Sequence, residues 1–129
     1  MISISVAHNE ARLTATRDFI DTGSANGKLR IYGNTRPANG AAAGADPLVE
    51  ILLDKPCGTV SAGALSLNAS DLPLIANSGA PTWARVVNGN GAHAFDCDAA
   101  GPGGTAEVIV SEATLYAGGQ VALVSAVLG

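Results

Sequence analysis

Charged side chains are scarce in this sequence, and the cations that are present do not cluster. The 129 residues include seven Lys and Arg against eleven Asp and Glu, which gives a net charge of −4 at pH 7. Non-specific binding to nucleic acid requires clustered Lys and Arg, because these displace counterions from the phosphate backbone. We therefore expect no nucleic-acid partner.

Long apolar runs are also missing. No apolar stretch approaches the length of about 18 residues that a membrane-spanning helix needs. The first residues do not show a basic segment followed by an apolar one, which is the pattern of an export signal. The expectation is a chain that has no membrane partner and is not exported by a recognisable signal.

Only two cysteines occur, Cys57 and Cys97, and they match no metal-binding spacing. Disulfides are rare in compartments that keep thiols reduced, and no export signal is visible. We therefore expect two buried free thiols, with a disulfide as the less favoured alternative.

Bulky side chains are few as well. Five residues are aromatic, whereas 24 are alanine and 16 are glycine. An apolar content of 47% nevertheless argues against a disordered chain, and the length suits a single domain over residues 1–129. Because the core must be built from Val, Leu and Ile, and because the surface is poor in charge, the composition favours further burial against a partner.

Near the N-terminus the apolar pattern predicts one helix, over about residues 8–21. Asn9 is the expected N-cap, and Gly23 supplies the stop. An alternating run over residues 2–6 precedes the helix and is typical of an edge strand. The apolar residues expected on one helical face are Ala11, Leu13, Ala15, Phe19 and Ile20.

Beyond the helix, apolar residues alternate with polar ones at the period of β-strands. A loop over residues 33–46, rich in Asn, Ala, Gly and Pro, predicts an exposed arm, and an Asn-Gly turn predicts a hairpin over 82–97. The other expected strands cover 28–32, 48–54 (ended by Pro56), 64–67, 106–110 and 120–128. The prediction is an all-β single domain of seven or eight strands with one helix. The strand pattern suits a β-sandwich or a barrel, and the sandwich or jelly roll is the favoured form.

Groups that could carry catalysis do not converge. On an ideal strand, His93 lies on the face opposite to Asp96 and Asp98, so no triad forms. Two carboxylates alone are too few ligands for Ca²⁺, and no nucleophile elbow or phosphate-binding loop is present. We therefore expect that the protein is not an enzyme and binds no metal and no cofactor. The alternative is a small hydrolase with His93 in a cleft.

Polar and aromatic residues around the predicted arm are the candidates for a contact surface. Arg30 and Tyr32 share the polar face of their strand and lead towards Arg36. Interfaces are enriched in Tyr and Arg. The candidate protein-contact residues are Arg30, Tyr32, Arg36, Pro37 and Asn39. Trp83 next to Arg85 is a second possible contact, but a lone Trp in a small β-domain is more often a core residue.

One segment carries a family resemblance. Residues 27–37 read GKLRIYGNTRP. They resemble the Leu-Arg-Ile-Tyr-x-Gly-Thr-Arg-Pro motif of small tailed-phage and prophage proteins, with Gly33-Asn34 where the motif prefers Asp-Gly. The similarity continues, in less specific segments, through 48–53, 82–87, 107–110 and 118–121.

This resemblance implies a structural protein of the virion. It suggests a capsid decoration or cement protein that binds the major capsid protein on the capsid surface, after assembly in the host bacterium's cytoplasm. Because symmetric shell positions are most simply filled by symmetric oligomers, a dimer or trimer is expected. The alternative is a tail-associated structural or receptor- or glycan-binding module, for which Tyr32 and Tyr116 are the only candidates for an aromatic platform.

Overall fold

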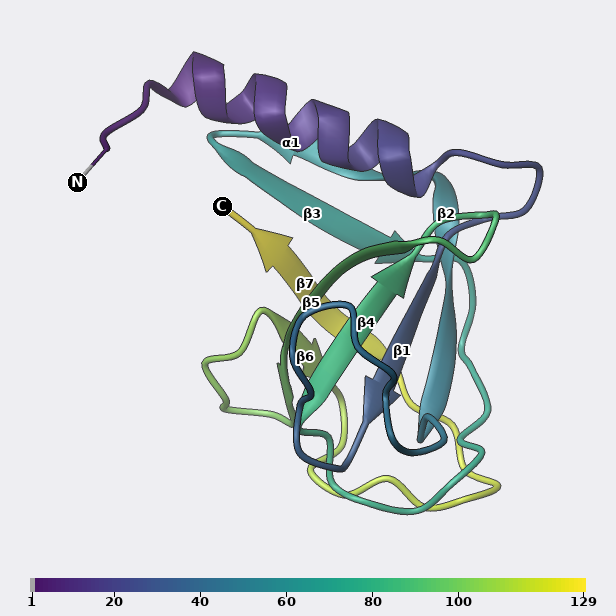
Figure 1. Ribbon diagram of the computed structural model, residues 1–129. Coiled ribbons are helices and arrows are strands. Elements are labelled where there is room, and N and C mark those ends of the chain that lie inside the picture. The colour runs from purple at the N-terminus through teal and green to yellow at the C-terminus, as the bar shows by residue number, and fades with distance from the viewer. Residues whose placement is uncertain (1) are drawn as a thin grey trace.

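The computed structural model describes residues 2–129 and contains one helix and seven strands (Figure 1). The elements are α1 (Val6–Ile20), β1 (Lys28–Tyr32), β2 (Val49–Ser61), β3 (Ala64–Ala69), β4 (Trp83–Val87), β5 (His93–Ala100), β6 (Val108–Val110) and β7 (Leu123–Leu128). The strands close into a barrel in the order β1-β2-β3-β7-β6-β5-β4. Neighbours are antiparallel except for β5 and β6, which are parallel.

The expected all-β class with a single helix is confirmed, whereas the two-sheet sandwich or jelly roll is not. The strand expected to end before Pro56 is longer than predicted. Strand β2 is 13 residues long and continues past the proline. Its first half pairs with β1 and its second half with β3, with a register shift between Leu53 and Gly58. Pro56 lies in this interruption, where the ladder does not need its missing N–H. The two halves of β2 therefore belong to different parts of the barrel wall.

The barrel interior is filled by the aliphatic residues that the alternation predicts. Leu29 and Ile31 of β1 are fully buried, as are Val49, Ile51 and Leu53 of β2. Burial of these side chains away from water is the main stabilising contribution to such a core. Cys57 and Cys97 join it as free thiols, as expected, and burial raises the pKa of each to about 12.

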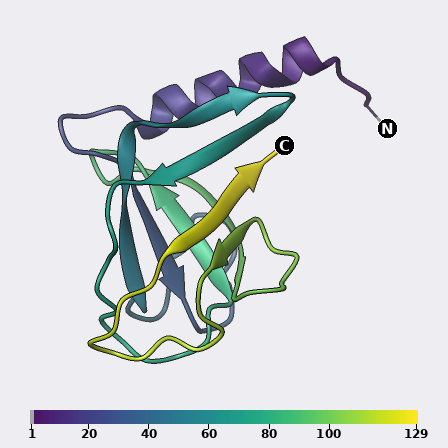
Figure 2. The ribbon, with the colours of Figure 1, turned by 180° about the vertical axis from the view of Figure 1, so that it is seen from behind.

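Helix α1 lies across one end of the barrel (Figures 1 and 2) and begins earlier than predicted. Its N-cap is Ser5, whose hydroxyl oxygen accepts a hydrogen bond from the His8 N–H at 3.1 Å. Asn9, the expected cap, instead donates its side-chain N–H to the Gly63 carbonyl at 3.0 Å. The strand expected over residues 2–6 does not form, because the chain already turns into the helix at Val6.

The buried face of α1 also differs from the expected one. Leu13 and Ile20 are buried against the barrel, whereas Ala11 and Ala15 are exposed. At about 100° per residue, these two alanines point almost opposite to Leu13. Phe19 is 41% exposed as well. The helix therefore presents an apolar stripe to solvent.

Removing the helix cap tests the corrected boundary. Substitution Ser5→Ala is expected to lower the free energy of unfolding by about 1 kcal/mol, because the N–H of His8 loses its acceptor. Ser3→Ala is the matched control, since residue 3 lies outside the helix, and no change above about 0.5 kcal/mol is expected. Urea unfolding followed by circular dichroism measures both values. Equal effects of the two substitutions would argue against the Ser5 cap.

The expected hairpin is present as β4 and β5, and it contains an irregularity that the sequence pattern does not reveal. Val86 pairs with Phe95, but Val87 pairs with His93, so that Ala94 is one extra residue in β5. A β-bulge of this kind reverses the alternation of the side chains beyond it. His93 therefore lies on the outer face of the barrel together with Asp96.

Candidate contact surface

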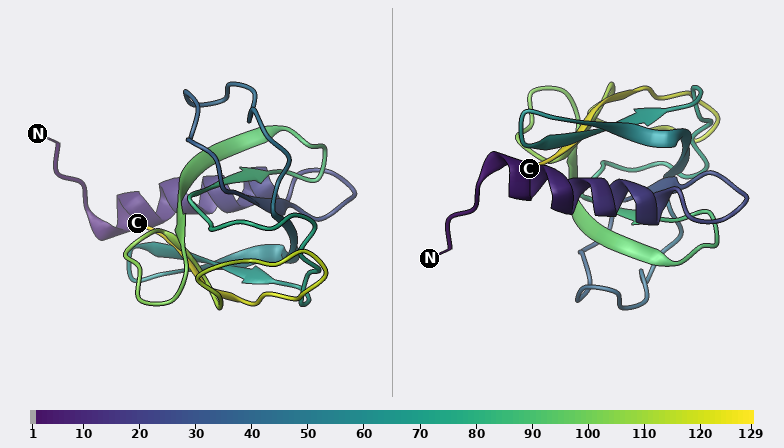
Figure 3. Two further views of the ribbon diagram at one scale, coloured as in Figure 1. Left: turned by 90° about the horizontal axis from the view of Figure 1, so that it is seen from below. Right: turned by 90° about the horizontal axis from the view of Figure 1, so that it is seen from above.

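The loop over residues 33–46 lies against the outside of the barrel, over β1, β4 and β5. In Figure 1 it runs in front of β4 and β1, and Figure 3 shows it standing out from the barrel on that side. Most of its residues are exposed, as predicted for an arm, but the loop is tethered. Beneath it is a group that we call the outer cluster, formed by Tyr32, Trp83, Arg85, His93 and Asp96.

Trp83 is the central residue of the outer cluster and is fully buried. Its ring stacks on Tyr32, with ring centroids 4.3 Å apart and an angle of 12° between planes. The Arg85 guanidinium lies 5.2 Å from the indole centroid, within cation–π range. Trp83 is thus buried, as expected, but beneath a loop on the outside of the barrel and not inside it.

Tyr32 is buried for the same reason and does not continue an exposed polar stripe. The register of β1 and β4 places Tyr32 beside Trp83, and only 4% of its surface is exposed. The expectation that Tyr32 lies on an exposed polar stripe is therefore wrong. Its ring instead packs against Trp83 and supports it.

Asn34 connects the loop to the cluster. Its side-chain oxygen accepts the Trp83 indole N–H at 3.0 Å, and its side-chain N–H donates to the Ala43 carbonyl at 2.8 Å. The Thr82 hydroxyl donates to the Asn34 backbone carbonyl at 2.6 Å. With Gly33, Asn34 departs from the motif that residues 27–37 resemble, and its role was not predicted from the sequence. The available signal was that asparagine in loops often bonds to backbone groups nearby.

A second set of bonds holds the far part of the loop. The Arg85 guanidinium donates to both carboxylate oxygens of Asp96, at 2.8 and 3.1 Å, and to the Ala41 carbonyl at 2.7 Å. The Gly40 N–H donates to Asp96 at 3.4 Å. The side chains of Arg85 and Asp96 are 12% and 3% exposed. This ion pair is therefore a buried clamp on the loop.

The His93 ring completes the clamp, with Nε2 at 3.1 Å from an Asp96 oxygen. Burial acts to raise the pKa of Asp96, but the hydrogen bonds from Arg85, His93 and the Gly40 N–H outweigh it and hold the pKa below its ordinary value. The predicted separation of His93 from Asp96 is wrong, because of the bulge at Ala94.

The acceptor positions of the Asp96 carboxylate are all occupied in this arrangement. A carboxylate offers about four acceptor positions, and Asp96 already accepts two bonds from Arg85 and one each from His93 and Gly40. Asp98, the other carboxylate of the expected pair, lies 3.4 Å from the Arg36 guanidinium.

Among residues 2–129, no group of three His, Cys, Asp or Glu side chains is placed to hold a metal ion. The helix in this part of the chain is not long and apolar enough to span a membrane.

The other sequence-predicted contact residues are partly brought together. Arg36, Pro37 and Asn39 line a hollow of about 320 Å³ together with Asp96. Arg30 lies apart, on the neighbouring part of the wall, where its guanidinium bonds to Glu50 at 2.8 Å. Of the five candidate residues, Arg36 and Asn39 are the ones that are exposed, and both lie on the loop.

The clamp predicts how stability depends on pH. The folded-state pKa of Asp96 lies below the unfolded value of about 3.9, so its carboxylate stabilises the fold fully above about pH 5. That contribution is lost as the pH falls through the folded-state pKa. The difference in free energy of unfolding between the wild type and Asp96→Asn should therefore shrink below about pH 4.

Urea unfolding at a series of pH values measures this difference. Asp98→Asn is the control, because that side chain is 62% exposed and lies outside the clamp. A difference between wild type and Asp96→Asn that stays constant down to the lowest pH would contradict the assignment.

Comparison with known proteins adds no family to this description: no protein-family model, no curated protein and no solved structure matches the chain.

Proposed function

We propose that this protein is a capsid decoration protein of a tailed bacteriophage. In this proposal it binds the outside of the icosahedral shell and stabilises contacts between major capsid protein subunits. The observation that carries it is the loop surface, since the phage-like motif over residues 27–37 forms both β1 and the first part of the clamped loop. In this proposal the motif contributes to a binding surface.

A clamped loop suits a binding role for an energetic reason. Ordering a mobile loop on binding costs conformational entropy, and a loop already held in place avoids most of that cost. Residues 34, 40 and 41 are each tied to the barrel side chains beneath them. Arg36 and Asn39 remain exposed on this fixed backbone, where a partner can bind them.

Binding of many copies would add to the stabilisation of the shell. A shell offers many equivalent joints, so a modest gain at each joint becomes large when many linked copies bind. A dimer or trimer would match the symmetry of such positions. The place of action in this proposal is the capsid surface, reached after assembly in the host cytoplasm.

The tail-module alternative has less support. It requires an aromatic platform, and Tyr32 is covered by the outer cluster. Tyr116 is 68% exposed but is the only tyrosine left for this purpose. One exposed ring is a weak basis for glycan recognition, so the decoration role is the one that we propose.

Copy number in purified virions tests the proposal. Mass spectrometry should find this protein in numbers comparable to the major capsid protein. A few copies per particle would contradict decoration and favour the tail, and complete absence from particles would reject both.

A binding assay then tests the loop surface. Binding to shells that lack the protein should weaken at least about tenfold in the double variant Arg36→Ala with Asn39→Ala. The control is Arg12→Ala, an exposed arginine on α1, which should bind normally. Equal binding by the two variants would exclude the loop as the docking face.

A further inference from the structure

The N-terminal segment over residues 2–5 has an unused apolar side. Ile2 and Ile4 alternate with serines and are 87% and 37% exposed, and Val6 at the start of α1 is 61% exposed. The segment is neither helix nor strand, and it leads away from the barrel beyond the end of α1 (Figures 1 and 2). We call it the N-terminal arm. Apolar side chains at alternate positions are typical of a β-strand that buries one face in a sheet.

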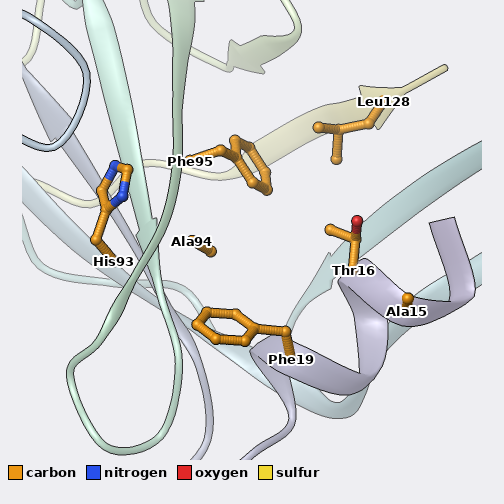
Figure 4. A pocket seen from close by; sticks show the side chains of 7 residues that line it. All are labelled: Ala15, Thr16, Phe19, His93, Ala94, Phe95 and Leu128. Atoms are coloured by element: carbon orange, nitrogen blue, oxygen red, sulfur yellow. The ribbon is translucent and has the colours of Figure 1, made fainter. Parts of the chain in front are cut away.

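An apolar groove of about 640 Å³ lies between α1 and the barrel wall. Figure 4 shows Phe19 and Ala15 on the helix side, and Ala94 and Phe95 of β5 with Leu128 of β7 facing them. Neither the groove lining nor the arm contains Lys, Arg, Asp or Glu. Contact between the two would therefore bury no unpaired carboxylate, ammonium or guanidinium side chain.

The groove also contains a free strand edge. On one side, β5 pairs with β4 from His93 to Asp98. On its other side, β5 pairs with β6 only at Ala99 and Ala100. Residues 93–97 thus have no neighbouring strand on that side among the described residues. Such an edge presents backbone N–H and C=O groups that can accept an added strand.

We propose that the N-terminal arm of one copy docks in the groove of a second copy. The arm adds as a short strand to the free edge of β5 and places Ile2 and Ile4 against Phe19 and Phe95. The occupant comes from a second copy because the chain's own arm is too short. Four residues reach at most about 14 Å, whereas Val6 and Phe19 are about 20 Å apart along the helix.

The contact joins two different surfaces of the protein, so it is heterologous. Such a contact forms a closed ring when the rotation between copies closes, and an open chain when it does not. The inference rests on the arm, the groove and the strand edge, and it does not depend on the proposed function. Its experiment uses purified protein alone, so its failure would leave the virion measurements to decide on decoration.

Sedimentation of the purified protein is the first measurement. The wild type should be larger than a monomer. The arm variant, Ile2→Asp with Ile4→Asp, and the groove variant, Ala15→Glu, should each weaken self-association at least about tenfold by placing a charge in an apolar contact. The control is Ala11→Glu, one turn away on the same exposed side of α1 and outside the groove lining, which should behave as wild type.

Mixing the two variants gives the decisive result. The groove variant keeps an intact arm and the arm variant keeps an intact groove, so a 1:1 mixture should form a complex of two chains and nothing larger. Circular dichroism confirms that each variant is folded, and the exposed position of Ile2 keeps that substitution away from the core. A monomeric wild type, self-association unchanged in both variants, or no complex in the mixture would each overturn the proposal. Variants that self-associate normally but no longer bind shells would assign the groove to the capsid protein, and would overturn it as well.

Discussion

Replacing Arg85 with alanine is expected to lower the free energy of unfolding by about 3–5 kcal/mol, because it leaves a buried carboxylate without its main partner. The side chain of Asp96 is 3% exposed and would keep only the contacts with His93 and the Gly40 N–H. The guanidinium also holds the far part of the loop through the Ala41 carbonyl, so that part should detach as well. Urea unfolding followed by the fluorescence of Trp83, the single tryptophan, measures the change.

Two further substitutions distinguish the effect of losing the buried Arg85–Asp96 pair from the effect of losing any positive charge. Arg30→Ala removes an ion pair on the same outer wall, but both its side chain and that of Glu50 are about a third exposed or more. Exposed pairs of this kind contribute about 0–1 kcal/mol. Arg85→Lys keeps the charge but loses the two-pronged geometry, so an intermediate effect is expected. If Arg85→Ala were no worse than Arg30→Ala, the clamp would not hold the loop.

Replacing Trp83 with alanine is expected to cost about 3–5 kcal/mol, the range found for large aromatic side chains removed from buried sites. The indole is fully buried and contacts Tyr32, Arg85 and Asn34 at once. Its loss leaves a void under the loop and an Asn34 oxygen without its donor. Thermal unfolding followed by circular dichroism measures the effect, since the fluorescent residue is gone.

Conservative and distant variants complete this test. Trp83→Phe retains a ring for stacking on Tyr32 but loses the indole N–H bond to Asn34, so a smaller loss is expected. Tyr116→Ala removes an exposed ring that is not part of the outer cluster and should change stability by less than about 0.5 kcal/mol. Comparable losses for Trp83→Ala and Tyr116→Ala would show that the outer cluster contributes little.

Local patterns predicted the secondary structure well where a short-range rule applies. The strand over 28–32 is confirmed with the same bounds, and the hairpin around the Asn-Gly turn is confirmed as β4 and β5. The Asn88 side chain, which accepts bonds from the N–H groups of Asn90 and Ala92, explains why this turn forms reliably. Strand starts in the last third were less accurate. Residue 120 makes only an isolated bridge, and β7 begins at Leu123.

The candidate surface was predicted in part. Arg36, Pro37 and Asn39 do share one hollow on the loop. Tyr32 could not be placed correctly, because its burial depends on Trp83, which is 51 positions later in the chain. His93 was placed on the wrong face because one inserted residue in β5 reverses the alternation, and single-sequence periodicity contains no sign of such a bulge.

By itself, the sequence determined the all-β class, the single helix, the aliphatic core and the free thiols, since these depend on composition and on periods of two or 3.6 residues. Tertiary structure alone decided that the strands close into a barrel, that the loop is clamped to its wall, and that α1 turns Leu13 and Ile20 inward. Each of these depends on contacts between residues far apart in the chain. Local periodicity predicts which residues share a face of a helix or strand. Only long-range packing decides which other element that face packs against.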